Sequence, residues 1–175
     1  NEIWNNSNLN EKDKQNLNSF FWLFSLDLKS SKKDTQDVLY QWINTNERYN
    51  SKNWKIDIIG KRIMAWISNS RLTYEDGSID YKDKFNGSVK KQINHLINEI
   101  EASELINDKI IGCAAIILTG LSYPQNNNYL NNGLSLLKKL TKSSLNNDGF
   151  PKSRSIRQLS FYLKYFILIR EWFKE

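Results

Sequence analysis

The chain is poor in the residues that build disulfides, metal sites and tight turns. Its 175 residues include one cysteine, one histidine, two prolines and seven glycines. A single cysteine excludes an intrachain disulfide, and one Cys with one His is too few for a Cys/His metal site. An all-β fold needs many Gly and Pro turns, so their scarcity argues against one. We therefore expect neither an all-β fold nor a metal site, and no other cofactor.

Long hydrophobic runs and dense charge blocks are also missing. The longest apolar run, residues 110–121, covers about twelve residues, whereas a membrane span needs roughly 18 or more. We therefore expect no membrane span. The formal net charge of +6 favours an anionic partner such as an acidic polysaccharide, a phospholipid or a nucleic acid. No Lys/Arg block of the kind that marks a nucleic-acid tail occurs, so we expect no nucleic-acid partner.

The beginning of the chain lacks an initiator methionine and a signal peptide. Asn1 is followed by Glu2 and Ile3, with no basic segment leading into an apolar one. We therefore expect the chain to be part of a longer protein.

Helical periodicity is what the sequence has in abundance. Apolar residues recur three or four positions apart, and no sustained two-residue alternation appears. The pattern predicts seven helices, over residues 11–28, 33–46, 54–67, 80–102, 109–121, 129–144 and 156–175. The second, fourth and sixth are amphipathic, while the fifth and seventh are apolar nearly throughout. This alternation favours antiparallel helical hairpins in two layers, with the odd-numbered helices inside.

The fold class that we expect is therefore all-α, with residues 1–175 forming a single helical domain. Repeated hairpins of this kind build either a solenoid or a closed α/α toroid. The lack of a strict sequence repeat weighs against a solenoid. A full toroid needs about twice this length, so the chain is expected to form a partial toroid of about seven helices.

Several single residues have an expected place in this fold. The fifth helix should be the most buried, with Ala114, Ile117 and Leu118 inaccessible, and Asn107 or Asp108 should be its N-cap. Cys113 lies in this apolar run and is expected to be a small core residue rather than a nucleophile. His95 lies on the amphipathic fourth helix, where a surface or interface role is expected.

Five segments, in order and at matching spacings, resemble the heparinase II/III-like proteins. Residues 53–67, with Trp54, Arg62 and Trp66, are similar to the family's W-x-P-x-x-x-x-x-R-x-x-x-W helix start. Residues 16–23 resemble its aromatic L-H-Y-F-x-W-L helix. Residues 101–108 resemble E-x-x-L-L-G-N-H, and residues 112–120 its Ala-rich A-L-x-x-A-G helix. Residues 147–155 resemble the D-G-x-x-x-x-R-S/N-P turn.

The resemblance implies a fold, a reaction and a place in the cell. Members of this family pair an α/α toroid with a C-terminal β-sandwich domain, and they cleave uronic-acid polysaccharides by β-elimination. The chain would then be the toroid portion, with an acidic polysaccharide and the β-sandwich domain of the same protein as its partners. The chemistry suggests the periplasm of a Gram-negative bacterium.

The resemblance also assigns roles to residues. Asn107 matches the amide that neutralises the substrate carboxylate, which stabilises the enolate formed when the C5 proton leaves. From the residues alone, a role as the cap of the fifth helix explains Asn107 better than a catalytic role does. Asp108 stands where the family has histidine, and its carboxylate would repel that of the substrate. This departure counts against ordinary catalysis.

The expected base position departs from the family as well. The catalytic Tyr of the family follows the Asp-Gly turn, where this chain has Ile156, Arg157 and Gln158. Tyr162 and Tyr165 come later, on an apolar helix where core packing is expected. The same departures leave room for an alternative function, a non-catalytic carbohydrate-binding or scaffold module; a weaker alternative is an unrelated helical interaction domain.

The remaining candidates are expected to bind substrate. Arg154 and Arg157 have the chemistry for bidentate contacts to an anionic sugar. Arg62 matches the family's helix-start Arg, although an ion pair between helices explains it equally well. Trp22 and Trp54 are expected to stack on sugar rings, with packing between helices as the alternative.

Overall fold

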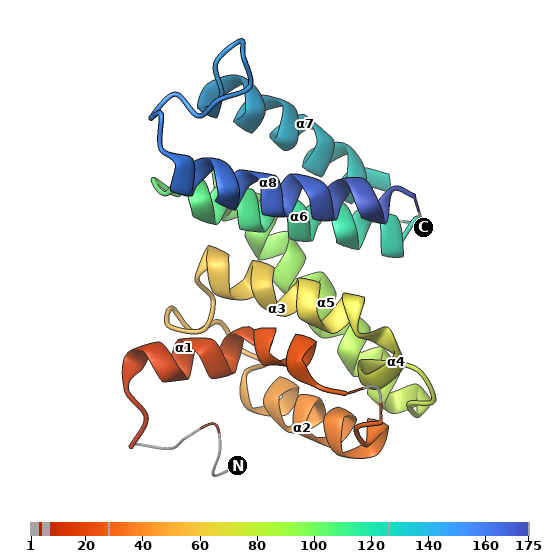
Figure 1. Cartoon of the computed structure of the whole chain (residues 1–175). Helices are drawn as coiled ribbons and strands as arrows, with labels where there is room; N and C mark the ends of the chain where they lie inside the picture. The colour runs from red at the N-terminus through yellow and green to blue at the C-terminus, as the bar shows by residue number, and fades with distance from the viewer. Residues whose placement is uncertain (1–3, 5–7, 28, 126, 175) are drawn as a thin grey trace.

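The all-α expectation is confirmed by a computed structural model, in which 73% of the chain is helical (Figure 1). The structure describes residue 4 and residues 8–27, 29–125 and 127–174. The only β feature within these ranges is an isolated bridge between Leu145 and Pro151. The helices are α1 (Glu11–Ser19), η1 (Phe21–Ser25), α2 (Lys32–Thr45), α3 (Ile56–Ser68), α4 (Ser70–Thr73), α5 (Ile79–Glu99), η2 (Ile100–Ala102), α6 (Ile106–Ser122), α7 (Asn127–Ser144) and α8 (Ile156–Trp172).

Local capping explains where four of these helices begin. The side chains of Asn10, Ser31, Ser78 and Ser155 each accept a hydrogen bond from a backbone N–H in the first turn of the helix that follows. Such caps satisfy donors that have no partner within the helix. The residue directly before α1, α2, α5 and α8 therefore determines where each of these helices begins.

The first expected helix is shorter than predicted. It was expected over residues 11–28, but α1 ends at Ser19, because Phe20 adopts a left-handed backbone with φ of 54°. The ring of Phe20 is fully buried there, so tertiary packing offsets the strain. Residue 28, at the expected end, lies outside the described residues, as does residue 175 at the expected end of the last helix.

Two hydrophobic clusters hold the fold together. The N-terminal cluster is built around Phe20, Trp42 and Trp66, whose rings meet edge to face 5.4–5.6 Å apart. The C-terminal cluster is built mainly from α6, with α7 and α8 packed on it. Helices α3 and α5 contribute residues to both clusters. They therefore join the lower half of the molecule in Figure 1 to the upper half.

Helix α6 is the most buried element, as expected. Ala114 and Ile117 are fully buried and Leu118 is 6% exposed. Cys113 is also in the core, and burial raises its pKa to about 12. It is therefore confirmed as a core residue. Helix α7 packs on α6 at close range, because Gly120 has no side chain to separate the two backbones.

Helix α8 departs from the expected arrangement. It was expected to be an inner helix, but it lies on the near side of α6 in Figure 1. Leu163 is 47% exposed and Ile167 is 52% exposed, so α8 is covered on one side only. The single-turn α4 brings the α-helices within the described ranges to eight, against seven expected. The partial toroid stays a prediction.

Candidate functional site

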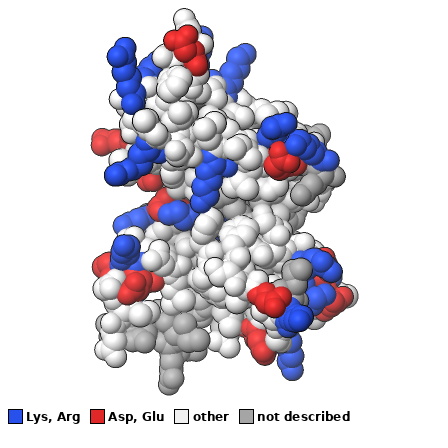
Figure 2. Space-filling model, viewed as in Figure 1, with Lys and Arg blue, Asp and Glu red and all other residues white. Residues whose placement is uncertain are grey.

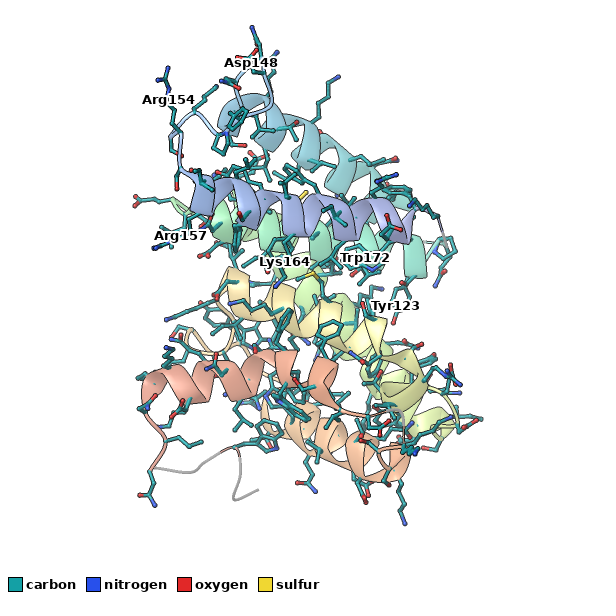
Figure 3. The ribbon with its side chains drawn as sticks, viewed as in Figure 1. Tyr123, Asp148, Arg154, Arg157, Lys164 and Trp172 are labelled. Carbon is teal, nitrogen blue, oxygen red and sulfur yellow. The ribbon has the colours of Figure 1, made fainter. Side chains whose placement is uncertain are left out.

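Helices α6 and α8 begin at the same end of the molecule, on the left in Figure 1. Helix α7 follows α6 in the chain and runs in the opposite direction. Helices α6 and α8 therefore run in the same direction. Asn107 is in the first turn of α6, and Arg154 and Arg157 flank the start of α8. Figure 3 shows both arginines at this end. The structure therefore brings these three predicted site residues to one end of the helical layers. We call Asn107, Arg154 and Arg157 the rim residues.

Asn107 does not cap α6, so that expectation was wrong. The cap position is Leu105, whose side chain makes no capping hydrogen bond. Asn107 is the second residue of the helix and is exposed. Its amide makes no hydrogen bond to another described residue and is free for a ligand. Backbone N–H groups of the first turn also point out of a helix start, and the helix dipole favours negative charge there.

The two arginines are held on a tight turn but are themselves exposed. Asn146 closes the turn, because its backbone N–H donates to Phe150 O and its side chain accepts from Phe150 N, both at 2.8 Å. Arg154 then adopts a left-handed backbone with φ of 57°, and its N–H donates to Pro151 O at 2.8 Å. Neither Arg154 nor Arg157 forms an ion pair with any residue that the structure describes.

The net charge of the protein is carried by the half that holds these residues. Residues 106–175 contain ten Lys and Arg against four Asp and Glu, whereas residues 1–105 contain fifteen of each. The whole formal charge of +6 therefore belongs to α6, α7, α8 and their loops. Figure 2 shows the basic side chains spread over this half rather than gathered in one block. Such a surface attracts an extended anion.

Two carboxylates lie beside the start of α6. The pKa of Asp108 is raised, first by partial burial and then by the negative charge of Asp57, while Lys61 and Lys55 lower it. Asp57 forms an ion pair with Lys61 at 2.9 Å. Asp57 also raises the pKa of Tyr165, after burial, to about 12. The charge of Asp57, on α3, therefore acts on ionisable groups of both α6 and α8.

The tyrosines of α8 are core residues, as expected. Tyr162 and Tyr165 are each 2% exposed. Burial raises the pKa of both hydroxyls, which makes a phenolate base costly to form. Within the described residues, no other tyrosine belongs to α8 or to the turn before it.

Arg62 is not a substrate-binding residue in this structure. It is fully buried, and its Nη1 donates to Asn18 O at 2.7 Å, its Nη2 to Asn53 O at 3.1 Å and its Nε to Gln92 Oε1 at 2.6 Å. Its guanidinium also lies 4.2 Å from the centre of the Trp42 ring. Burial lowers its pKa to about 9, so it is still charged at neutral pH. Arg62 joins α1, α3, α5 and the segment before α3, without an ion pair among the described residues.

The two candidate tryptophans are packed among other rings. Trp22 is half-buried against Phe20, and its Nε1 donates to Leu17 O at 3.2 Å. Trp54 is 8% exposed and packs against Tyr49 and His95. His95 therefore has an aromatic packing role at a half-buried position. Sugar stacking by Trp22 and Trp54 stays a prediction.

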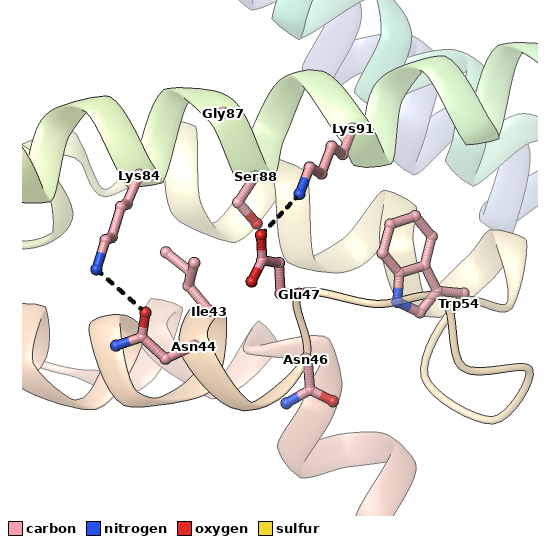
Figure 4. A pocket seen from close by; sticks show the side chains of 9 residues that line it. All are labelled: Ile43, Asn44, Asn46, Glu47, Trp54, Lys84, Gly87, Ser88 and Lys91. Carbon is pink, nitrogen blue, oxygen red and sulfur yellow. Dashed lines mark hydrogen bonds and ion pairs between the residues drawn. The ribbon is translucent and has the colours of Figure 1, made fainter.

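The sequence interpretation missed a groove between α2 and α5. It has a volume of about 220 Å³, and Lys84, Gly87, Ser88 and Lys91 line it from α5 (Figure 4). Trp54 lines one end. A signal was present, because positions 84, 87, 88 and 91 share one face of a helix. However, lysines are common on the exposed face of amphipathic helices, so their presence did not indicate a groove.

Comparison with family models, with curated proteins and with solved structures finds no match to this chain. Within the described ranges, no helix is both long and apolar enough to cross a bilayer, and no three His, Cys, Asp or Glu side chains gather as a metal site.

Proposed function

We propose that this chain is the N-terminal helical part of a heparinase II/III-like polysaccharide lyase. The whole protein would cleave a uronic-acid polysaccharide by β-elimination, with a C-terminal β-sandwich domain completing it and the periplasm as its location. The observation that carries this proposal is the placement of the exposed rim residues at one end of the half that bears all of the net charge. The sequence resemblance supports it independently of that placement.

Each rim residue has a role suited to its chemistry. The amide of Asn107 donates to the carboxylate of a uronate and so stabilises the enolate that forms when the C5 proton leaves. Arg154 and Arg157 pair with sulfate or carboxylate groups on neighbouring sugars, for which a guanidinium offers two parallel donors. The base that removes the proton comes from another part of the whole protein, because Tyr162 and Tyr165 are buried.

A second candidate function is a non-catalytic module that binds the same class of glycan. Asp108 favours it, because its carboxylate, next to Asn107 in the chain, opposes a substrate carboxylate. Arg157, at the position of the family's catalytic tyrosine, also favours binding over proton transfer. Both candidate functions require the rim residues to bind an acidic glycan. One binding experiment therefore tests this shared requirement.

The test measures binding of heparin and alginate oligosaccharides by calorimetry. Arg154→Ala and Arg157→Ala are expected to weaken binding by about 1–3 kcal/mol each, because each removes a charge-assisted contact. Arg71→Ala, an exposed arginine on α4, is the matched control and should leave binding unchanged. Equal losses in all three variants, or equal binding of a neutral oligosaccharide, would contradict the proposal.

Catalysis is tested separately on the full-length protein. A β-elimination leaves an unsaturated uronate, whose ultraviolet absorbance rises as the polysaccharide is cut. Cleavage by the full-length protein that is abolished by Asn107→Ala supports the proposal that the protein is a lyase. Binding without any rise in absorbance supports the non-catalytic module instead.

A further inference from the structure

The groove between α2 and α5 ends at the indole N–H of Trp54, for which the described part of the chain offers no acceptor. Trp54 is 8% exposed, and its Nε1 is buried without a hydrogen-bond partner among the described residues. In Figure 4 the nitrogen edge of this indole faces the side of the groove where Glu47 and Asn46 lie. An indole nitrogen only donates, and a buried donor left unbonded costs about 1–3 kcal/mol. The groove therefore presents a donor that an acceptor on a ligand would satisfy.

Ser88 provides a second donor, oriented by a chain of hydrogen bonds that starts at Arg62. The guanidinium donates to Gln92 Oε1, so the amide nitrogen of Gln92 must face Ser88, and it donates to Ser88 Oγ at 3.0 Å. The hydroxyl proton of Ser88 is then free to point away from Gln92. Because Arg62 is buried without a carboxylate partner among the described residues, its positive charge polarises this chain toward the groove.

Two lysines stand on either side of Ser88. Lys84 and Lys91 are two helical turns apart on the groove face of α5. Lys84 Nζ bonds the hydroxyl of Tyr40 at 2.6 Å and Asn44 Oδ1 at 3.4 Å, both neutral. Lys91 Nζ pairs with Glu47 at 3.2 Å. Glu47 is 70% exposed, so this pair is weakly held and open to competition.

The groove has room for a ligand, and one of its lining residues, Gly87, has no side chain. A Cβ built on Gly87 meets no atom within 4 Å. The volume of about 220 Å³ suits a ligand about the size of one sugar ring rather than a long polymer.

We propose that this groove binds the carboxylate group of a ligand of monosaccharide size, with Trp54 N–H, Ser88 O–H and Lys91 as its donors. The groove lies on α2 and α5, away from the rim residues, and its assignment does not depend on the proposed function. The carboxylate would displace Glu47 from Lys91 and satisfy the indole. Its source is either a free sugar acid or the end unit of an acidic chain.

The experiment follows the indole N–H of Trp54 by ¹H–¹⁵N correlation NMR, with Trp54→Phe assigning the peak. Titration with glucuronate is expected to move this peak downfield and to saturate, whereas glucose, the neutral isostere, should leave it in place. A uronate trisaccharide forms the second arm. Similar affinity for both ligands identifies the end unit of a chain, and tighter binding of glucuronate than of the trisaccharide identifies a free sugar acid.

Surface variants separate the proposed contacts from general charge. Ser88→Ala and Lys91→Ala are expected to weaken glucuronate binding about tenfold each, as for a lost hydrogen bond to a charged group. Lys90→Ala, the neighbouring lysine outside the groove, should change nothing. Glu47→Gln should strengthen binding several-fold, because it frees Lys91. Gly87→Leu should abolish binding by adding a large side chain to the lining of the groove, while the far-UV spectrum stays helical.

Three results would overturn the proposal. These are an unmoved Trp54 peak at saturating glucuronate, an equal response to glucose, and a Lys90→Ala loss as large as that of Lys91→Ala. Arg154→Ala and Arg157→Ala should leave the glucuronate response intact. This control keeps failure of the groove distinct from failure of the rim residues.

Discussion

The guanidinium of Arg62 and the carboxamide of Gln92 are joined inside the protein by a hydrogen bond of 2.6 Å. Both side chains are buried, and they come from α3 and α5, the two helices that contribute to both hydrophobic clusters. A buried charge is tolerated when it is hydrogen-bonded. Here two backbone carbonyls and one amide oxygen each accept a hydrogen bond from one of the three guanidinium nitrogens, with the Trp42 ring alongside.

Arg62→Lys should therefore be strongly destabilising although it keeps the charge. One ammonium group cannot reach acceptors on three segments, so at least one buried acceptor is left unbonded. We expect the free energy of unfolding to fall by about 2–4 kcal/mol, measured by urea titration. Arg71→Lys, at an exposed position, is the control. If the two variants were equally stable, the buried network would have no net role.

Gly120 should tolerate no side chain. A Cβ there would lie 2.5 Å from the backbone nitrogen of Leu130 and 2.6 Å from its Cα, so α6 and α7 would have to move apart. We expect Gly120→Ala to cost about 1–3 kcal/mol or more. Gly87→Ala is the matched control, because its Cβ meets open space. The better helix propensity of alanine should make that variant more stable by about 0.5–1 kcal/mol. A denaturation curve for each variant checks the opposite signs.

Ile117→Ala tests the central position of α6. The side chain is fully buried in the C-terminal cluster, so its truncation leaves a cavity and should cost about 2–5 kcal/mol. Ile79→Ala, at a residue 81% exposed, should change stability by less than about 0.5 kcal/mol. Similar values for both would mean that α6 is not the centre of the packing.

Tyr165 should make the fold sensitive to alkali. Its pKa is raised to about 12 in the folded protein from an ordinary value of 10.0. Between these values the unfolded chain has lost the proton and the folded protein has kept it, so stability falls as pH rises through this window. Tyr165→Phe should reduce the loss of stability between pH 10 and pH 12, seen as a smaller drop in melting temperature. Tyr49→Phe, at a ring 64% exposed, is the control.

Helix positions and the buried core were readable from the sequence because both depend on the spacing of apolar residues. That spacing predicted α2, α3, α5, α6, α7 and α8 to within a few residues. It missed α4, because four residues are too few to show a helical period. The same spacing predicted that the first helix continues past Phe20, whereas the chain turns at Phe20 and buries its ring. Such a turn depends on Trp42 and Trp66, which are distant in sequence.

The candidate site was predictable only in part, since a sequence shows that a residue is charged but not whether it is exposed. Arg154 and Arg157 follow an Asp-Gly turn and are at the surface, whereas Arg62 lies in an apolar helix and is buried. Asn107 resembled a cap, but the cap residue is Leu105, two positions before it, and α6 begins at Ile106. Caps depend on backbone angles that residue type alone does not determine.

The uneven placement of tryptophan has a spectroscopic consequence. Trp4, Trp22, Trp42 and Trp66 belong to the N-terminal cluster, whereas the C-terminal cluster has only Trp54 and Trp172. Intrinsic fluorescence therefore reports mainly on one half of the molecule, while far-UV ellipticity reports on every helix. Because α3 and α5 are shared by both clusters, the two signals should follow one denaturation curve. A difference between the midpoints of the two curves would show that one half of the molecule unfolds before the other.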